Sequence, residues 1–246
     1  MLAVRSLKVR YRGSALGVYW SLSNPLIMTA IYSAIFGTAF AKYYGNSVVN
    51  YVLACFTGLV VLNFFSQTSS QALTSIVSNG ALLNKMRLPV SAFPLSLVLA
   101  NLFQYAVGVI PLLVAVTLYV SHSPLHCVYL IVPSIALLMV TVGFSLGMAA
   151  LFVFFRDLPY LYELVVFALW ITSPIFYPID LVPAGVRHWV TLNPIADIIE
   201  LVRTIVFTQG PPTGAAMLNA LTVSAVSLVA GVLIFRLTES DFMDLI

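Results

Sequence analysis

Charged residues are scarce in this sequence. Only 8% of the 246 residues are Asp, Glu, Lys or Arg, whereas 61% are hydrophobic and the mean hydropathy is +1.04. An ordinary soluble domain carries roughly a quarter charged residues. So few charges cannot cover a surface in water, so most of this surface must face lipid. The scarcity excludes an ordinary soluble domain and predicts an all-α integral membrane protein.

The residue patterns of most enzymes and nucleic-acid-binding proteins are also missing. The two cysteines, Cys55 and Cys127, lie in or beside apolar stretches without zinc-like spacing, so we expect neither a disulfide nor a metal site. The sequence has no G-x-x-x-x-G-K-[ST] run for nucleotide phosphates and no recognisable nucleophile motif. A net charge of +3 is too small to indicate nucleic acid. We therefore expect no catalytic residue, no metal ligand and no cofactor in this chain.

Six stretches are long and apolar enough to cross a membrane, which takes roughly 20 residues at about 1.5 Å each. Their interiors look nearly bare of the buried polar groups that an intramembrane enzyme would need. Prolines inside the third stretch predict kinks or an offset start. The first apolar run is too long for a cleavable signal peptide. The predicted spans cover residues 22–41, 51–71, 92–119, 128–155, 158–177 and 215–235.

The distribution of Lys and Arg predicts how these spans are oriented. If the N-terminus is cytoplasmic, eight basic residues lie inside and three outside. We therefore expect both termini in the cytoplasm and the polar segment 178–213 outside. The inside set is Arg5, Lys8, Arg10, Arg12, Lys85, Arg87, Arg156 and Arg236, and the outside set is Lys42, Arg187 and Arg203.

The segment before the first span has the pattern of a short amphipathic helix. On a helical wheel, Val4, Leu7 and Tyr11 share one face. This pattern favours an interfacial helix in the headgroup layer, with its cations reaching the phosphates. The alternative is a disordered basic tail that only obeys the positive-inside rule. The cations on the two flanks are Arg5, Lys8, Arg10 and Arg12.

Aromatic side chains form an arc on each of two predicted spans. In the first span they recur at i+4 spacing, and in the fifth they lie on the side that also carries Glu163 and Pro174. They either face lipid and fill helix contacts, or line a path on which sugar rings stack. The candidate path residues are Tyr32, Phe36 and Phe40 in the first span, and Phe167, Trp170 and Tyr177 in the fifth.

Two connecting segments carry their own signals. Segment 72–88 places Leu73, Ile76, Val77 and Leu83 near one helical stripe, which suits docking into a groove on a soluble partner. The alternative is an ordinary basic anchor at the end of a span. Its residues nearest a partner would be Leu83, Asn84, Lys85 and Arg87.

The second segment follows the fifth span. Asn193 as N-cap and Pro194 at the first helical position predict a helix. Its apolar face is Ile195, Ile198, Ile199 and Val202. Glu200 and Arg203 are three residues apart, so we expect that they can pair.

Short motifs across nearly the whole chain resemble the polysaccharide-exporting ABC type 2 permeases, which include Wzm-type O-antigen, capsule and teichoic acid exporters. They occur in that family's order, although Ser6 stands where an acidic residue is usual. The motifs are LKVRYRGS at 7–14, Leu16-Gly17, Trp20-Ser21, Asn24-Pro25, Asn84-Lys85 with Pro89, FRDL at 155–158, SPIFYP at 173–178, and the segment from Asn193-Pro194 to Glu200 and Arg203.

The resemblance implies a homodimer of six-span subunits in a bacterial plasma (inner) membrane, bound to two copies of a separate ABC ATPase. That partner would bind ATP and Mg, and the substrate would be an undecaprenyl-diphosphate-linked glycan moved to the outer face. Segment 72–88 would be a coupling helix, and the first and fifth spans would border a lateral exit for the lipid. A re-entrant external gate would precede the last span, with Pro174, Pro178, Asn193, Pro194, Glu200 and Arg203 in it.

Two other functions fit the same composition. One is a drug or small-lipid exporter of the same superfamily, and the other is a membrane scaffold that transports nothing. Aromatic rather than charged candidate path residues favour a glycan, and a segment suited to coupling argues against a scaffold.

Overall fold

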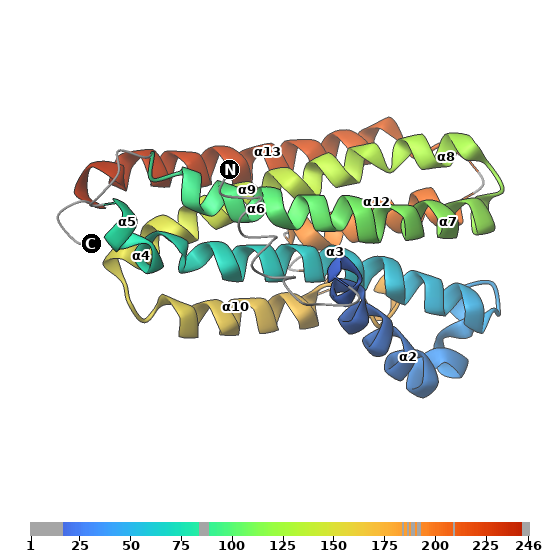
Figure 1. The fold of residues 1–246 in the computed structure, drawn as a ribbon. Helices are drawn as coiled ribbons and strands as arrows, with labels where there is room; N and C mark the ends of the chain where they lie inside the picture. The colour runs from blue at the N-terminus through green and yellow to red at the C-terminus, as the bar shows by residue number, and fades with distance from the viewer. Residues whose placement is uncertain are drawn as a thin grey trace.

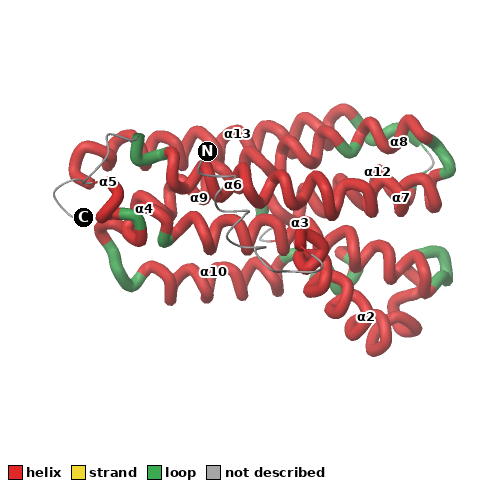
Figure 2. Tube along the Cα trace, in the orientation of Figure 1, coloured by secondary structure: helices red, strands yellow, loops and turns green. Residues whose placement is uncertain are grey.

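The computed structural model is an elongated bundle of helices (Figures 1 and 2). It describes residues 17–83, 89–183, 193–208 and 210–242, together with Gly185, Arg187 and Val190. Every regular element within these residues is helical, which confirms the all-α part of the predicted fold class. The predicted interfacial helix, with Arg5, Lys8, Arg10 and Arg12, lies outside the described residues.

The helix bounds follow the chain in this order: η1 Gly17–Tyr19, α2 Trp20–Phe40, η2 Ala41–Tyr43, α3 Val48–Leu73, α4 Ser75–Ser78, α5 Gly80–Leu83, α6 Ala92–Gln104, η3 Tyr105–Val109, α7 Ile110–Ser121, α8 Pro124–Tyr129, α9 Ile131–Phe154, α10 Leu158–Thr172, η4 Ile179–Leu181, α12 Pro194–Phe207, α13 Gly214–Thr238 and η5 Glu239–Asp241.

Among the described residues, five helical stretches are long and apolar enough to cross a membrane. They are Trp20–Tyr43, Val48–Leu73, Ala92–Ser121, Pro124–Phe154 and Gly214–Asp241. The chain is therefore a multi-pass membrane protein, and five of the six predicted spans meet the length criterion.

The predicted fifth span is shorter than expected. Helix α10 ends at Thr172, because Ser173 is extended (ψ 129°) before Pro174. Its 15 residues reach about 22 Å, less than the roughly 30 Å of a bilayer core. The boundary at residue 177 was wrong because a backbone break beside a proline was counted as part of an apolar run.

The two prolines of the third predicted span are accommodated differently. Pro94 lies in the first turn of α6, where its missing N–H would have no helical partner. Pro111 lies at the start of α7, directly after the π-helix η3. A π-turn widens the helix where a proline cannot donate its hydrogen bond. The span continues through a local irregularity, as the sequence predicted.

The bundle has two ends, which we name the Gly45 end and the Arg156 end. At the Gly45 end, His126 Nε2 is hydrogen-bonded to the carbonyl oxygen of Gly210 at 3.1 Å. In the α2–α3 connection, the Tyr44 ring lies 6.1 Å from the Phe207 ring at the end of α12. The α2–α3, α7–α8 and α12–α13 connections therefore lie at one end (Figure 1). At the Arg156 end, the α9–α10 turn lies near α4, α5 and the end of α13 (Figure 1).

Helices α9 and α13 pack closely along their length. A Cβ atom at Gly231 would overlap the carbonyl of Gly143, and one at Gly143 would overlap the main chain at Ser227. Gly143 begins a G-x-x-x-G sequence, a pattern that lets helices approach closely. This pair forms one side of the bundle.

Helix α3 lies at the centre of the bundle and is buried along most of its length. Helix α12 packs against α3, α7, α9 and α13, and its predicted apolar face is buried. Helices α2 and α10 contact α3 from one side of the bundle (Figure 1). They leave a groove between them, with α3 as its floor.

Candidate functional site

The groove carries a continuous strip of aromatic rings in its Gly45 half. On α2, Tyr32 and Phe36 stack with ring centroids 6.1 Å apart, and Phe36 and Phe40 stack at 5.7 Å. Phe176 stacks on Tyr32 at 3.6 Å and on Trp170 of α10 at 5.9 Å. The interplanar angles are all 16–18°, so neighbouring rings are nearly parallel to one another. We call these five residues the aromatic strip.

Phe176 connects the rings of α2 to Trp170 of α10, and helical periodicity could not predict its position. It lies in the non-helical segment 173–176 after α10, so no helical wheel places it beside α2. Through Phe176, Tyr32 of the α2 arc and Trp170 of the α10 arc lie beside one another, and the use of these rings as a sugar path stays a prediction. Phe167 is 64% exposed, and the Tyr177 hydroxyl donates to the carbonyl of Ile171 at 2.7 Å.

Segment 173–176 is held by hydrogen bonds to its carbonyls. Arg203 of α12 donates to the carbonyl oxygens of Pro174 and Ile175, the latter at 2.8 Å. The Tyr51 hydroxyl donates to the carbonyl of Phe176 at 2.8 Å. Non-helical backbone is tolerated at membrane depth only when such groups are satisfied by protein or water. These bonds therefore fix the position of the Phe176 ring.

Arg203 is only 6% exposed and also donates to the carbonyl of Ala54, at 3.2 Å from Nη2. The expected pairing of Glu200 with Arg203 is wrong, since the guanidinium points to three carbonyls instead and the Glu200 side chain is exposed. A buried charge needs many polar partners, and charge-assisted hydrogen bonds to carbonyls supply them. Arg203 thus ties α12 to α3 and to the break after α10.

Asn193 makes the second connection between α10 and α12. Its Oδ1 accepts from the main-chain N–H of Ile195 at 2.9 Å, which confirms the predicted N-cap. Its Nδ2 donates to Ser173 Oγ at 2.9 Å and to Thr172 Oγ1 at 3.3 Å. The start of α12 is therefore bound to the end of α10.

A cavity of about 230 Å³ lies at the Gly45 end, next to the segment after α10 and the second half of α12. It carries carboxylates from Asp180 and Glu200 beside the Arg203 guanidinium. Burial raises the pKa of the Tyr44 phenol, and the charge of Arg203 partly offsets that rise. Pro178 also lines the cavity, so two prolines of the predicted gate segment, Pro174 and Pro178, lie near Arg203.

The Arg156 half of the groove is polar. A cavity of about 380 Å³ is walled by α2, α3 and α10, with Val166 and Trp20 as its apolar members. The sequence prediction that span interiors are nearly bare of polar groups was wrong. Single carboxamides in apolar runs look isolated in sequence, but neighbouring helices bring them together. The polar lining residues are Ser21, Asn24, Asn63, Ser66, Gln67, Ser70 and Tyr162.

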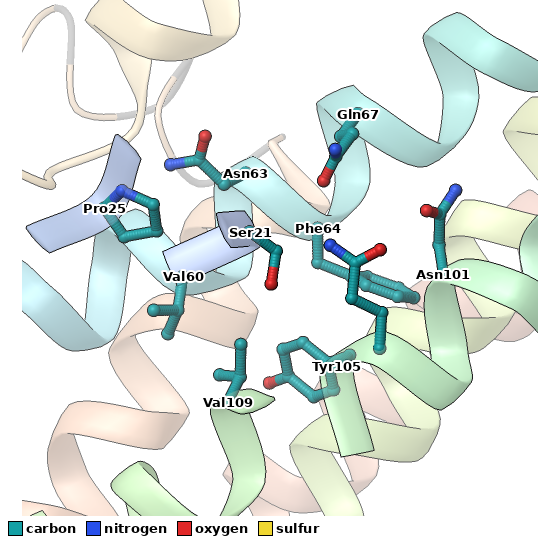
Figure 3. Close-up of a pocket in the computed structure, with 10 residues that line it drawn as sticks. Ser21, Pro25, Val60, Asn63, Phe64, Gln67, Asn101, Tyr105 and Val109 are labelled. Atoms are coloured by element: carbon teal, nitrogen blue, oxygen red, sulfur yellow. The ribbon is translucent and has the colours of Figure 1, made fainter. Parts of the chain in front are cut away.

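A smaller opening of about 30 Å³ adjoins this cavity and shares Ser21, Asn63 and Gln67 with it. Figure 3 shows Ser21, Asn63, Gln67 and Asn101 around this opening, between α2, α3 and α6. Asn101 donates to Gln71 Oε1 at 3.0 Å, so part of this polar region joins helices to one another.

Part of the apolar stripe that was predicted on segment 72–88 is buried within this chain. Leu73 and Ile76 are buried, with Ile76 in a cluster that includes Val90 and Phe93. They are not available to a partner. Helix α5 ends at Leu83, and the Leu83 side chain and the coupling residues Asn84, Lys85 and Arg87 lie outside the described part.

Comparison with known proteins gives a consistent set of relatives. The family model for ABC-2 type transporters matches residues 1–207. The O-antigen export system permease protein RfbA of Klebsiella pneumoniae is 30% identical over 197 residues, 79% of this chain and 74% of the relative. RfbA of Myxococcus xanthus is 26% identical over 245 residues, 99% of this chain and 93% of the relative. The polysialic acid transport protein KpsM of Escherichia coli is 20% identical over 98% of this chain and 93% of its own length. Because the family match covers most of its length, this chain belongs to the ABC-2 type transporter family.

Proposed function

We propose that this chain is the membrane subunit of an ATP-driven exporter that moves lipid-linked polysaccharide from the cytoplasmic to the outer face of a bacterial inner membrane. Relatives named for O-antigen and polysialic acid export support a polysaccharide substrate. The observation that carries the proposal is the aromatic strip, which runs along the groove from Phe40 to Trp170 through Phe176.

Parallel aromatic faces suit a long glycan that must slide. The C–H face of a sugar ring packs on the face of an aromatic ring, and this contact makes few demands on hydroxyl positions. A series of similar faces therefore gives each sugar unit several contacts of similar strength. No single contact then traps the chain.

The connection of α10 to α12 supports a gate above the strip. The structure joins the break after α10 to α12 through Arg203 and Asn193. Helix α12 is a buried helix of 14 residues, too short to span, whose far end approaches the Gly45 end. These features fit a re-entrant external segment, 173–203, that closes the groove.

The remaining parts of the exporter come from other chains in this proposal. ATP and Mg are bound by two copies of a separate ABC ATPase, since this sequence has no nucleotide-binding loop. A second copy of the chain completes the conduit, and the glycan is carried on undecaprenyl diphosphate. Exposed apolar residues on α2 and α10, such as Ile35 and Leu164, fit a lateral exit towards lipid.

Orientation rests on the excess of basic residues on one side, eight against three. The Gly45 end is then external and both termini are cytoplasmic. Reporter fusions after Gly45, His122 and Gly210 test this, because the structure places all three at one end. All three are expected to report an external location, and a cytoplasmic signal at Gly210 would contradict the proposed topology.

The proposed path is tested by replacing Trp170 and Phe36 together with Leu. Leu keeps apolar bulk but removes the flat face, whose stacking is worth about 0.5–1.5 kcal/mol per ring pair beyond area. We expect export of cell-surface glycan to fall far more than the amount of protein in the membrane. The matched control is Phe103→Leu, a half-exposed ring on α6 outside the groove. Equal export from the double variant and the control would show that the rings only pack.

A further inference from the structure

Polar side chains form a stripe along the groove-facing side of α3. Asn63, Gln67, Ser70 and Thr74 follow one another at spacings of four, three and four residues, so they share a helix face. Gln67, Ser70 and Thr74 are exposed, and Asn63 is partly exposed. The stripe occupies only the Arg156 half of α3, since the other half of the helix is apolar and buried.

The opposite walls of the groove add hydrogen-bonding groups. Asn24 of α2 donates to Asn63 Oδ1 at 3.3 Å, and the Tyr162 hydroxyl of α10 donates to the carbonyl of Ser66 at 2.7 Å. Ser21 also lines this cavity. Among the described residues that line it, none carries a charge. The polar groups that the described residues contribute to this cavity are therefore amides and hydroxyls.

The polar side chain of Gln67 does not serve to join one helix to another. One turn further along α3, Gln71 accepts a hydrogen bond from Asn101 at 3.0 Å and so connects α3 with α6. The Gln67 carboxamide has no hydrogen bond to any other described residue, although Asn63 and Ser66 beside it both have one. A carboxamide left in lipid costs several kcal/mol, so polar groups at membrane depth face cavities or partners.

We propose that this cavity binds the hydroxyl groups of uncharged sugar rings, and hence that the exported glycan has an electrically neutral backbone. A carboxamide offers two donors and an acceptor, which match a hydroxyl that both donates and accepts. A carboxylate or phosphate on the glycan accepts only, and it is bound best by Arg or Lys. Asn63 and Gln67 offer such an anion no positive charge in return for the water that it loses.

This inference rests on the proposed export function and adds the substrate's charge class. In the exporter, the polar cavity would receive each sugar before the aromatic strip does, because it lies in the cytoplasmic half of the groove. Hydrogen bonds there replace the water that a sugar loses on leaving the cytoplasm. The sugar then moves on to the stacking faces.

The test measures oligosaccharide binding to the full chain in lipid nanodiscs by isothermal titration. The probes are maltoheptaose, which is uncharged, and an oligogalacturonate of the same length, which is anionic. We expect maltoheptaose to bind and the oligogalacturonate to bind at least about tenfold more weakly. The variant Gln67→Leu should weaken maltoheptaose binding about tenfold, the effect of losing one well-made hydrogen bond. The thermal stability of this variant should be unchanged, because Gln67 makes no hydrogen bond to any other described residue.

The matched control is Gln71→Leu, which removes the same side chain from the same helix. Because Gln71 joins α3 to α6, this variant should lose thermal stability while keeping its affinity for maltoheptaose. No measurable maltoheptaose binding, equal binding of the anionic probe, or an unchanged affinity in Gln67→Leu would each overturn the inference. If export still falls in the Trp170→Leu, Phe36→Leu variant, the export function stands and only the assignment of this cavity fails.

Discussion

The two halves of the groove use different chemistry on the same three helices. In the Gly45 half, α2 and the end of α10 present flat rings, and the floor of α3 is apolar. In the Arg156 half, the same helices present carboxamides and hydroxyls. Rings give a glycan contacts that do not depend on exact hydroxyl positions, whereas carboxamides require partners at set positions. In the exporter that we propose, a sugar is selected in one half and passed along in the other.

The halves also differ in what supports them. The polar half is built from side chains on regular helices, and its members are one or two turns apart. The aromatic half depends on Phe176, which lies on non-helical backbone held by Arg203 and Tyr51. Losing the support of that segment should therefore disturb the aromatic half and leave the polar half intact.

The variant Arg203→Met is expected to show the largest difference between the two halves, because it should impair the aromatic half and leave the polar half intact. Two buried carbonyls, at Pro174 and Ile175, would lose their donors, at a cost of about 3 kcal/mol. Thermal unfolding of the purified protein should shift downward and glycan export should be lost. Maltoheptaose affinity of the folded protein should stay within about twofold of the unmodified chain, because Gln67 and Asn63 are unaffected.

The control for this variant is Arg187→Met. Arg187 is exposed and lies 3.9 Å from Asp180, and exposed ion pairs contribute about 0–1 kcal/mol. Export and stability should change little. If Arg203→Met were as mild as this control, the buried guanidinium would not be what holds the aromatic half together.

A smaller effect is expected from Tyr162→Phe in the polar half. The hydroxyl of Tyr162 donates to the carbonyl of Ser66 and lies 2.8 Å from Ser69 Oγ, so removing it should cost about 1 kcal/mol of stability. The stacking rings of the other half should be unaffected. Thermal unfolding compares this variant with Tyr160→Phe, whose side chain is 74% exposed on the same helix. Equal melting temperatures would show that the hydroxyl contributes nothing to the packing of α10 on α3.

Local patterns in the sequence predicted the helices, because caps and periodicity depend on residues that are close together in the chain. Asn193 followed by Pro194 predicted the start of α12, and the structure has that cap. The G-x-x-x-G sequence that begins at Gly143 is typical of a close helix approach, and Gly231 of α13 lies against it. Tyr32, Phe36 and Phe40 recur at i+4 spacing and stack along one face of α2, because side chains at that spacing share a face of a helix.

Contacts between segments far apart in sequence were not predictable in the same way. Glu200 and Arg203 have the spacing of a helical pair, but Arg203 reaches carbonyls that only the break after α10 exposes. Phe176 follows that break and has no periodicity to reveal its place. Asn63 and Gln67 lie in one apolar run and Asn101 in another, so their gathering depends on how α3 and α6 pack.

Photo-cross-linking of the glycan from each half tests the central claim most directly. A photoreactive phenylalanine analogue would be placed singly at Gln67, at Phe36 and, as the control, at Phe103, in cells whose partner ATPase cannot hydrolyse ATP. The stalled glycan should be cross-linked from the Gln67 and Phe36 positions and not from Phe103, which lies on α6 outside the groove. Cross-links from Phe103 alone, or none from either groove position, would contradict a glycan path between α2 and α10.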